Sequence, residues 1–375
     1  MSRGTPEPAL PPLIDRGVAC RHQRHQSPGP HPTLAPAWLA TGMRRATTPP
    51  GRRSVLFVVE CLVPSPMRAV RNTLDGIRVV GTEPHRDGVR VSVASSGICG
   101  SDLHLISFGP LEVTLGHEFS GWLDDGTPVA VVPVAPCGHC DRCLAGEEQQ
   151  CAAALGTLYG MSRDGGLADE VWVDPECAKA LPADIPLEHA CLTEPLAVAL
   201  HGVNRAGVLA GMRVLVVGAG PIGLCAIAAA RERGAEVDLA AHRSARLTAG
   251  ERLGASASIG TGYDIVLEAA GTQQSFDRSV ELVRPGGTIG ILATFWEPVT
   301  VGMGFLVKEV SLVPSFTYGH HHGVSEFEDA MRVLGAVPDL PDTVITHRFS
   351  LDDATEAFRV AGDRTSDAIK VVLHP

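Results

Sequence analysis

The chain has 375 residues, of which 45% are hydrophobic, and its formal net charge is −11 at pH 7. This length allows two domains with a core that needs no disulfide staples. The acidic balance argues against nucleic acid or an anionic membrane as a partner, and no apolar run reaches the roughly eighteen residues that a membrane-spanning helix needs.

Residues 1–66 differ in composition from the rest of the chain. They hold 12 of the 28 prolines, eight arginines and only three acidic residues. Such a segment has no periodicity of a strand or helix, so we interpret it as a disordered extension or as an over-long start before Met67. Arg52 and Arg53 precede the apolar run 55–63, which leaves a twin-arginine export signal as an alternative without a clear cleavage site.

Short strands follow this segment. Apolar alternation predicts strands at residues 67–71, 77–80 and 89–94, separated by Asp-Gly turns, and two more at 129–134 and 167–173. These segments predict that the first domain is rich in β-structure.

A glycine-rich segment after the third strand carries Cys99, and His117 and Glu118 follow within a short interval. Thiolate, imidazole and carboxylate are the three ligand types that Zn²⁺ accepts. Each residue alone is unremarkable, because a lone cysteine is usually a small buried hydrophobe. Together they predict a catalytic zinc site. Glu194, midway along a helix expected over residues 186–201, is the candidate for the fourth position.

Four further cysteines have the spacing C-x2-C-x2-C-x7-C. They are Cys137, Cys140, Cys143 and Cys151. Four thiolates on a small lobe suit a closed structural zinc site, whose metal contributes directly to local folding. An iron–sulfur cluster also uses four thiolates, but the Cys-Pro ending of the bacterial ferredoxin pattern is missing, so it is the weaker alternative.

A new pattern starts near residue 211. The continuous apolar run 213–217 is typical of a buried parallel strand, and a helix at 224–233 and a strand at 236–240 follow it. The G-x-G-x-x-G turn between strand and helix predicts a dinucleotide site, because its glycines admit the pyrophosphate and let the helix pack on the strand. The turn residues expected to bind the cofactor are Gly218, Gly220, Pro221, Ile222 and Gly223.

The end of the second strand of this unit decides between NAD and NADP. An acidic residue there would accept hydrogen bonds from the ribose 2′-hydroxyl and repel a 2′-phosphate. The chain instead has Ala241, His242 and Arg243, with Arg246 one turn further. Guanidinium groups bind phosphate in bidentate fashion, so NADP is favoured, and NAD is the alternative if these arginines only cover a solvated helix start.

The nucleotide-binding unit is shortened after this point. Its third strand is expected at residues 256–259, yet only residues 260–262 separate it from the strand 263–268. In a doubly wound sheet those strands lie about 14 Å apart, and a parallel connection normally needs roughly a dozen residues. We therefore predict that the usual helix is missing and that residues 256–262 form the crossover.

The C-terminal part is predicted to be regular. Strands are expected at residues 288–293 and 368–373, and Ser350 with Asp353 fits a capping box ahead of a helix. The run of three histidines at 320–322 invites a metal hypothesis, but no acidic or thiol partner lies close to it in sequence.

These motifs occur together, and in this order, in one known family. From Met67 onward the chain resembles the zinc-containing medium-chain dehydrogenase/reductase (alcohol dehydrogenase) family, and its sorbitol, threonine and glucose dehydrogenase branch in particular. The matching segments are residues 97–104, 115–118, 137–151, 165–170, 194–196, 218–223 and 284–287.

The resemblance implies an α/β protein with a GroES-like β-barrel catalytic domain and a Rossmann doubly wound nucleotide-binding domain. The catalytic domain would occupy residues 67–200 with its zinc lobe at 137–151, the nucleotide-binding domain residues 201–319, and residues 320–375 would return to the catalytic domain. The trimmed interval between Cys99 and His117 departs from the family pattern.

The resemblance also implies roles for individual residues. It places a catalytic zinc on Cys99, His117 and Glu118, with Glu194 as a direct or water-bridged ligand, and a structural zinc on the four-cysteine lobe. Asp102 would orient His117, Ser101 would begin a proton relay, and His104 would be an outer relay member. Zinc would act as a Lewis acid on the substrate oxygen while hydride passes to nicotinamide.

The resulting prediction is a zinc-dependent dehydrogenase that reversibly oxidises a secondary alcohol, polyol or sugar-like alcohol with NADP or NAD. One alternative is a ketone reductase in cyclitol or sugar biosynthesis. Another, from a different class, is a catalytically silent relative that binds NADP and zinc. We expect a small-molecule substrate, two zinc ions per chain, a homodimer or homotetramer, and a cytoplasmic location.

Overall fold

The computed structural model describes residues 66–375, apart from the side chain of Leu155. These residues belong to one compact unit. The predictions of a disordered extension or an export signal lie outside the described residues. Within the described range, no helix is both long and apolar enough to cross a membrane.

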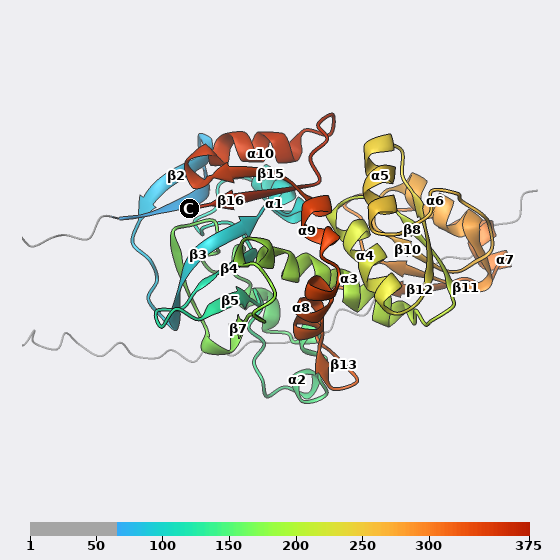
Figure 1. Ribbon diagram of the computed structural model, residues 1–375, viewed down its shortest axis with the longest axis horizontal. Helices are drawn as coiled ribbons and strands as arrows, with labels where there is room; N and C mark the ends of the chain where they lie inside the picture. Colours follow the sequence, from blue (N-terminus) through green and yellow to red (C-terminus); the bar gives the residue numbers. More distant parts are fainter. Residues whose placement is uncertain (1–65) are drawn as a thin grey trace, which may run out of the picture. The chain divides into compact units, whose positions relative to one another are not determined.

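Strands from the first half of the chain and from its C-terminus share one sheet (Figure 1). The order is β15-β16-β3-β4-β5-β7, and β6 also pairs with β3. The bounds are β3 (Val89–Gly97), β4 (Glu118–Trp122), β5 (Pro128–Val131), β6 (Glu170–Val173), β7 (Ala178–Ala180), β15 (Ile345–Ser350) and β16 (Lys370–His374). Because β16 runs antiparallel to β3, the last strand lies beside the strand that leads to Cys99.

The two faces of this sheet carry separate apolar clusters, as the alternation of side chains along a strand requires. Val91, Val93 and Phe119 belong to one cluster. Leu115, Leu373 and residues of helix α10 (Ala354–Gly362) belong to the other. The hairpin of β1 (Met67–Thr73) and β2 (Gly76–Thr82) adds to the second cluster through Val70 and Ile77.

The second large sheet consists of five parallel strands in the order β12-β11-β10-β8-β9. They are β8 (Arg213–Val217), β9 (Glu236–Ala240), β10 (Tyr263–Glu268), β11 (Val283–Ile291) and β12 (Ser311–Pro314). Val214 and Val216 contribute to one apolar cluster, whereas Leu215 and Val217 contribute to another. Burial on both faces explains the continuous apolar run in β8.

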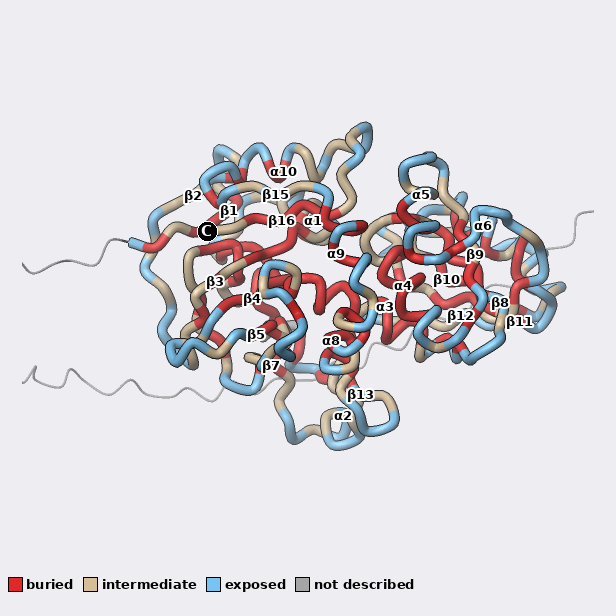
Figure 2. The backbone as a smooth tube through the Cα atoms, in the orientation of Figure 1, coloured by how far each residue is buried: buried red, intermediate tan, exposed pale blue. Residues whose placement is uncertain are grey.

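Helices cover this sheet and connect it to the first one. The longer ones are α3 (Thr193–Ala206), α4 (Pro221–Glu232), α5 (Ser244–Arg252), α6 (Gln273–Leu282) and α8 (Glu326–Ala336). The shorter ones are α1 (Gly100–Leu105), α2 (Asp141–Leu144), α7 (Met303–Val307) and α9 (Asp339–Val344). Figure 2 shows α3 and α4 as largely buried, and both contribute to the largest apolar cluster.

The predicted shortening of the nucleotide-binding unit is confirmed. Among the described residues no helix lies between α5 and β10, and the expected third strand is reduced to a single parallel bridge between Asp238 and Ser256. The sheet therefore has five strands, and residues 256–262 cross from the β9 edge to β10.

Two other local predictions need correction. The helix expected over residues 186–201 begins as a 3₁₀ segment, Leu187–Leu192, and is α-helical only from Thr193. Glu194 therefore lies in the first turn of α3 and not midway along a helix. The capping box at Ser350 does not form, because the Ser350 hydroxyl bonds to the Asp353 side chain at 2.7 Å and makes no backbone cap.

Candidate active site

Cys99 lies where β3 ends and α1 begins. It is the N-cap residue of α1, with extended backbone angles, and its N–H donates to Asp102 Oδ2 at 2.9 Å. A carboxylate in the first turn satisfies an N–H group that the helix leaves unpaired. The short helix thereby fixes the Cys99 backbone at the end of β3.

The structure brings together three of the four predicted ligands of the catalytic site. The ligand atoms of Cys99, His117 and Glu118 all lie within 4.8 Å of one another. His117 and Glu118 are buried, and Cys99 is half-buried. The donor set of one thiolate, one imidazole and one carboxylate matches what Zn²⁺ binds in proteins.

Glu118 is held by a buried ion pair. Lys370 Nζ in β16 lies 2.7 and 2.6 Å from the two carboxylate oxygens of Glu118 and also donates to the carbonyl of Ile98 at 3.0 Å. Gly97 makes room for this carboxylate, because a Cβ there would lie 2.3 Å from Glu118 Oε2. The site therefore needs both a glycine in β3 and a lysine from the last strand.

Two groups surround the His117 imidazole. Asp102 Oδ1 lies 3.4 Å from Nδ1, and the Ser101 hydroxyl lies 3.3 Å from Nε2. Burial lowers the pKa of His117, but Asp102 and then Cys99 outweigh it, so this pKa lies well above its usual value. The raised pKa reports an excess of negative charge around the imidazole, which a bound cation would neutralise.

Glu194 is buried beside this cluster but is not one of the three mutually close ligands. Burial raises its pKa to about 8, with Glu118 adding to the rise and His117 opposing it. The carboxyl group therefore stands near the cluster without completing it.

His104 lies outside the contacts around His117 that the structure shows. Its imidazole stacks on the indole of Trp296, with ring centroids 4.1 Å apart and planes at 20°.

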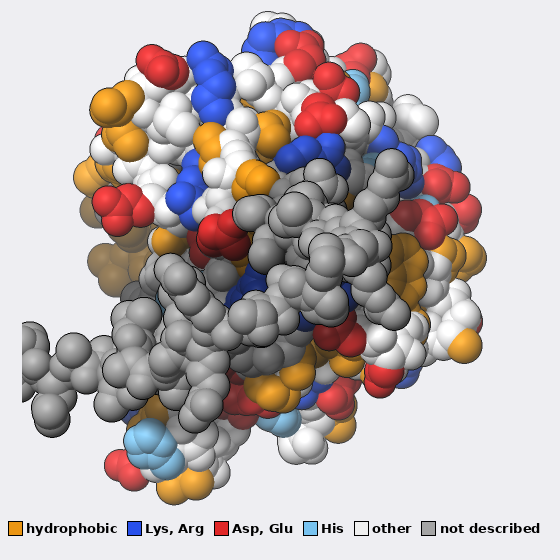
Figure 3. Space-filling model, turned by 90° about the vertical axis from the view of Figure 1, so that its left-hand side faces the viewer, with side chains coloured by type: hydrophobic (Ala, Val, Ile, Leu, Met, Phe, Trp, Pro, Cys, Tyr) orange, Lys and Arg blue, Asp and Glu red, His pale blue; other side chains and the backbone are white. Residues whose placement is uncertain are grey.

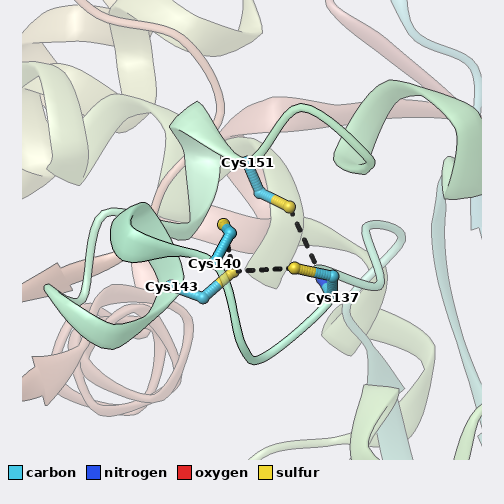
Figure 4. A group of neighbouring side chains, drawn as sticks. All are labelled: Cys137, Cys140, Cys143 and Cys151. Atoms are coloured by element: carbon cyan, nitrogen blue, oxygen red, sulfur yellow. Dashed lines mark hydrogen bonds between the residues drawn. The ribbon is translucent and has the colours of Figure 1, made fainter.

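The four lobe cysteines converge as predicted (Figure 4). Their sulfur atoms all lie within 4.8 Å of one another, and the Cys140–Cys143 and Cys137–Cys143 pairs are 3.5 and 3.9 Å apart. Tetrahedral Zn–S bonds of about 2.3 Å would place sulfur atoms about 3.8 Å apart. None of the eight cysteines in the described range forms a disulfide, so the lobe suits a metal and is not a cross-link.

The glycine-rich turn has the shape that a dinucleotide site requires. Gly218 has φ +106, and a Cβ on Gly223 would lie 1.9 Å from the Gly218 carbonyl oxygen. Gly220 is the N-cap of α4, with Pro221 and Ile222 in its first turn. The helix N-terminus therefore faces the turn, which favours an anionic ligand.

A cavity of about 900 Å³ opens at this turn and reaches the predicted cofactor-selecting residues His242, Arg243 and Arg246. Arg243 donates to the Ser366 carbonyl at 2.7 Å, and Arg246 donates to the carbonyls of Ala219, at 3.0 Å, and Ala368. Burial, followed by repulsion from Arg243, lowers the pKa of Arg246. Both guanidinium groups thus line the cavity while contacting the segment that leads into β16.

Sequence reasoning missed two buried polar residues beside the catalytic cluster. Lys370 interrupts an otherwise apolar closing strand, which was the available signal for a buried counter-charge. Tyr318 gave no such signal. Its hydroxyl is buried without a hydrogen-bond partner in residues 66–375, and burial followed by Glu194 raises its pKa.

The histidine run does not form a metal cluster in the described part of the chain. His320 and His321 form β13 (His320–His321), which pairs with β14 (Val324–Ser325), and His320 Nδ1 lies 2.7 Å from Glu148 of the cysteine lobe. The run therefore contributes to packing between this hairpin and the lobe.

The chain is similar to known proteins over most of its length. Residues 85–183 match the alcohol dehydrogenase GroES-like domain family, and residues 187–374 match the glucose dehydrogenase C-terminus family. The galactitol 1-phosphate 5-dehydrogenase of Escherichia coli K12 is 32% identical over 353 residues, which cover 82% of this chain and all of that protein. The L-idonate 5-dehydrogenase (NAD(P)(+)) of the same organism is 32% identical, covering 77% of this chain and 92% of that protein.

Solved structures agree with the sequence matches. Galactitol-1-phosphate dehydrogenase from Escherichia coli superposes with a TM-score of 0.73 at 33% identity, covering 82% of this chain and all of that one. A zinc-binding dehydrogenase from Sinorhizobium meliloti 1021, bound to NADP, superposes with a TM-score of 0.72 at 31% identity, covering 83% and 100% of the two chains.

The chain belongs to the zinc-containing medium-chain dehydrogenase/reductase family. Its predicted fold class, a GroES-like catalytic domain with a Rossmann-type nucleotide-binding domain, is confirmed. Within that family it is a zinc-dependent oxidoreductase of the alcohol dehydrogenase class, and it matches polyol and sugar-acid dehydrogenases.

Proposed function

We propose that this protein catalyses NADP-linked oxidation of a secondary hydroxyl group on a polyol or sugar-like alcohol, and the reverse reduction of the ketone. The observation that carries the proposal is the convergence of Cys99, His117 and Glu118 beside the Ser101 hydroxyl. The relatives named for galactitol 1-phosphate and L-idonate support the substrate class.

We assign Cys99, His117 and Glu118 as the residues that hold the catalytic zinc, with Glu194 as a water-bridged fourth group. The fit rests on the donor set and on the excess negative charge at the site. Zinc, when bound there, supplies Lewis-acid polarisation of a substrate oxygen. The Lys370 contact with both Glu118 oxygens means that Glu118 binds the metal only in competition with an internal cation.

The protein side of proton transfer begins at Ser101. Its hydroxyl stands 3.3 Å from His117 Nε2, next to the cluster, so it can accept a proton from a substrate hydroxyl and pass its own outward. Asp102 keeps the His117 ring oriented from the other nitrogen. His104 is proposed as the outer member of this relay.

NADP is proposed as the cofactor, supported by the absence of an acidic side chain at residues 241–243 and by the two arginines on the cavity. Asp238, the acidic residue of β9 nearer to its carboxyl end, already accepts a hydrogen bond from the Tyr263 hydroxyl at 2.5 Å, which argues against it as a substitute for the missing carboxylate. Arg243 and His242 would contact the 2′-phosphate, and Gly218, Gly220, Pro221, Ile222 and Gly223 the pyrophosphate.

A second, structural zinc is proposed at Cys137, Cys140, Cys143 and Cys151, which gives two zinc ions per chain. The sulfur separations of 3.5 and 3.9 Å support this assignment.

The eight cysteines in the described range form no disulfide, which suits a reducing compartment, so we propose a cytoplasmic location.

We also propose the predicted domain limits and a homodimer. The limits are 67–200, 201–319 and 320–375, supported by β15 and β16 joining the first sheet.

For the dimer, β12 is the outer strand of the five-stranded sheet, and α7 beside it exposes Met303, Leu306 and Val307 by more than 70%. An exposed edge with an apolar border can pair with its own copy about a twofold axis. On the described residues visible in Figure 3, charges of both signs are interspersed.

The test is a panel of polyols, sugar alcohols and their ketones, assayed with NADP and NAD separately through the absorbance of the reduced nicotinamide. Oxidation of a polyol with NADP is the expected result. Activity only in the direction of ketone reduction would favour the biosynthetic reductase. No turnover combined with one zinc ion per chain would indicate a silent relative, whereas two zinc ions are expected for the enzyme.

A further inference from the structure

A stacked ring pair joins the helix of the proposed proton relay to the nucleotide-binding part of the chain. His104, in the last turn of α1, stacks on Trp296, in the loop between β11 and α7, with centroids 4.1 Å apart and planes at 20°. These two segments are remote in sequence, and α1 follows a strand of one sheet while the loop follows a strand of the other. The contact is therefore specific to the assembled fold.

The Trp296 loop has a fixed base. Phe295 packs edge-on against Phe276 of α6, with centroids 6.1 Å apart and planes at 85°. The backbone N–H of Leu292 donates to the Glu268 carbonyl at 2.9 Å, and a Cβ on Gly271 would lie 2.7 Å from the Thr294 carbonyl oxygen. The loop is thus packed closely at the carboxyl end of β10, even though 44% of the Trp296 surface is exposed.

His104, unlike the Trp296 loop, lies on a short helix. It lies three residues after Ser101, so the two side chains lie on neighbouring positions of α1, but α1 has only six residues. A half-buried histidine on such a short helix can occupy several rotamers. Only some of them would turn the imidazole toward Ser101, one helical turn away, where it could receive a proton.

We propose that Trp296 is a positioning residue for the proton relay, which fixes the orientation of the His104 imidazole one helical turn from Ser101. The inference rests on the proposed function, because it takes His104 as the outer relay member. Stacking covers a face of the imidazole and leaves the two ring nitrogens at its edge. One nitrogen can then accept a proton from the Ser101 side while the other releases one to water.

A double-mutant cycle on kcat tests this role in the zinc-loaded enzyme. The variants are Trp296→Ala, His104→Gln and the two combined. Trp296→Ala is expected to lower kcat about three- to tenfold, the span that an aromatic pair contributes to an equilibrium, and to change the cofactor KM by less than about twofold. In the His104→Gln background the same substitution should have no further effect, because the residue through which it acts is gone.

Two further variants separate positioning from general damage. Trp296→Phe keeps an aromatic face and should recover most of kcat. Trp122→Ala removes an indole that is 46% exposed on β4 and should leave kcat unchanged. The solvent isotope effect on kcat should rise in Trp296→Ala, because proton transfer becomes more limiting, whereas a change in folding alone would not move it.

The outcomes distinguish this inference from the function on which it rests. If His104→Gln leaves kcat unchanged, the relay role of His104 is wrong, and Trp296 has no relay to position. If His104→Gln is slow but Trp296→Ala is not, only the role of Trp296 is overturned. An equal loss from Trp296→Ala in both backgrounds would also overturn it, because the two residues would then act independently.

Discussion

Replacing Lys370 by methionine should show how much of the catalytic cluster depends on a buried internal cation. The substitution keeps an unbranched side chain but removes the ammonium group that contacts both Glu118 oxygens at 2.6 and 2.7 Å. The two side chains are only 2% and 1% exposed, so water cannot replace the lost partner. Removing one member of a buried ion pair typically costs about 3–5 kcal/mol, because the other charge is left unpaired. We expect a loss of that size in the unfolding free energy of the metal-free protein.

The assay is urea unfolding, followed by circular dichroism, of chelator-treated and zinc-loaded protein. The loss for Lys370→Met should be smaller in the zinc-loaded form, because the metal gives Glu118 another cation. The matched control is the double variant with Glu118→Gln, which removes the stranded charge and should recover most of the stability. If Lys370→Met is as stable as the parent without metal, or if the double variant is less stable than the single one, the reasoning is refuted.

Three further predictions concern the reaction, the cofactor and the assembly. Ser101→Ala should lower kcat by roughly 10²–10⁴-fold, the usual contribution of a group in proton transfer. Cys99→Ala should abolish turnover and reduce the zinc content, and retained activity of a metal-free Cys99→Ala protein would contradict the mechanism. Arg243→Ala should lower kcat/KM with NADP by roughly 10–100-fold, as expected for the loss of charged hydrogen bonds, and leave kcat/KM with NAD nearly unaffected. Arg246→Ala should lower kcat/KM with both cofactors alike, because Arg246 also donates hydrogen bonds to the carbonyls of Ala219 and Ala368. Leu306→Lys, on the exposed face of α7, should shift the protein toward monomers in sedimentation analysis, and an unchanged assembly would show that α7 is not the interface.

The fold was predictable where the pattern of the chain is local. The glycine turn at Gly218, the strands β8 and β9 and the missing helix before Tyr263 all follow from short-range spacing. The start of α3 was not, because residues 187–192 have helical spacing but are 3₁₀ in the structure. The Ser350 cap failed for a similar reason, since its hydroxyl has a side-chain partner that competes with the backbone.

The metal-binding residues of the site could be predicted from the sequence, but the residues that hold the site in place could not. The sequence pattern identified Cys99, His117 and Glu118, and their ligand atoms do converge. It could not supply the contacts that Lys370 and Trp296 make, because each meets its partner from a segment remote in sequence. Spacing predicts contacts along one element, whereas these contacts depend on how β16 and the β11–α7 loop are placed against β3 and α1.

The same remoteness gives the end of the chain a role in both halves of the site. The Ser366 carbonyl accepts from Arg243 and the Ala368 carbonyl accepts from Arg246, while the Lys370 side chain contacts Glu118. Three residues of this short segment thus contact two arginines at the cofactor cavity and a proposed ligand of the zinc. A 2′-phosphate bound by Arg243 would compete with the Ser366 carbonyl for the same guanidinium group. The return of the chain to β16 therefore does more than complete a sheet, because the same segment contacts the arginines at the cofactor cavity and Glu118 in the catalytic cluster.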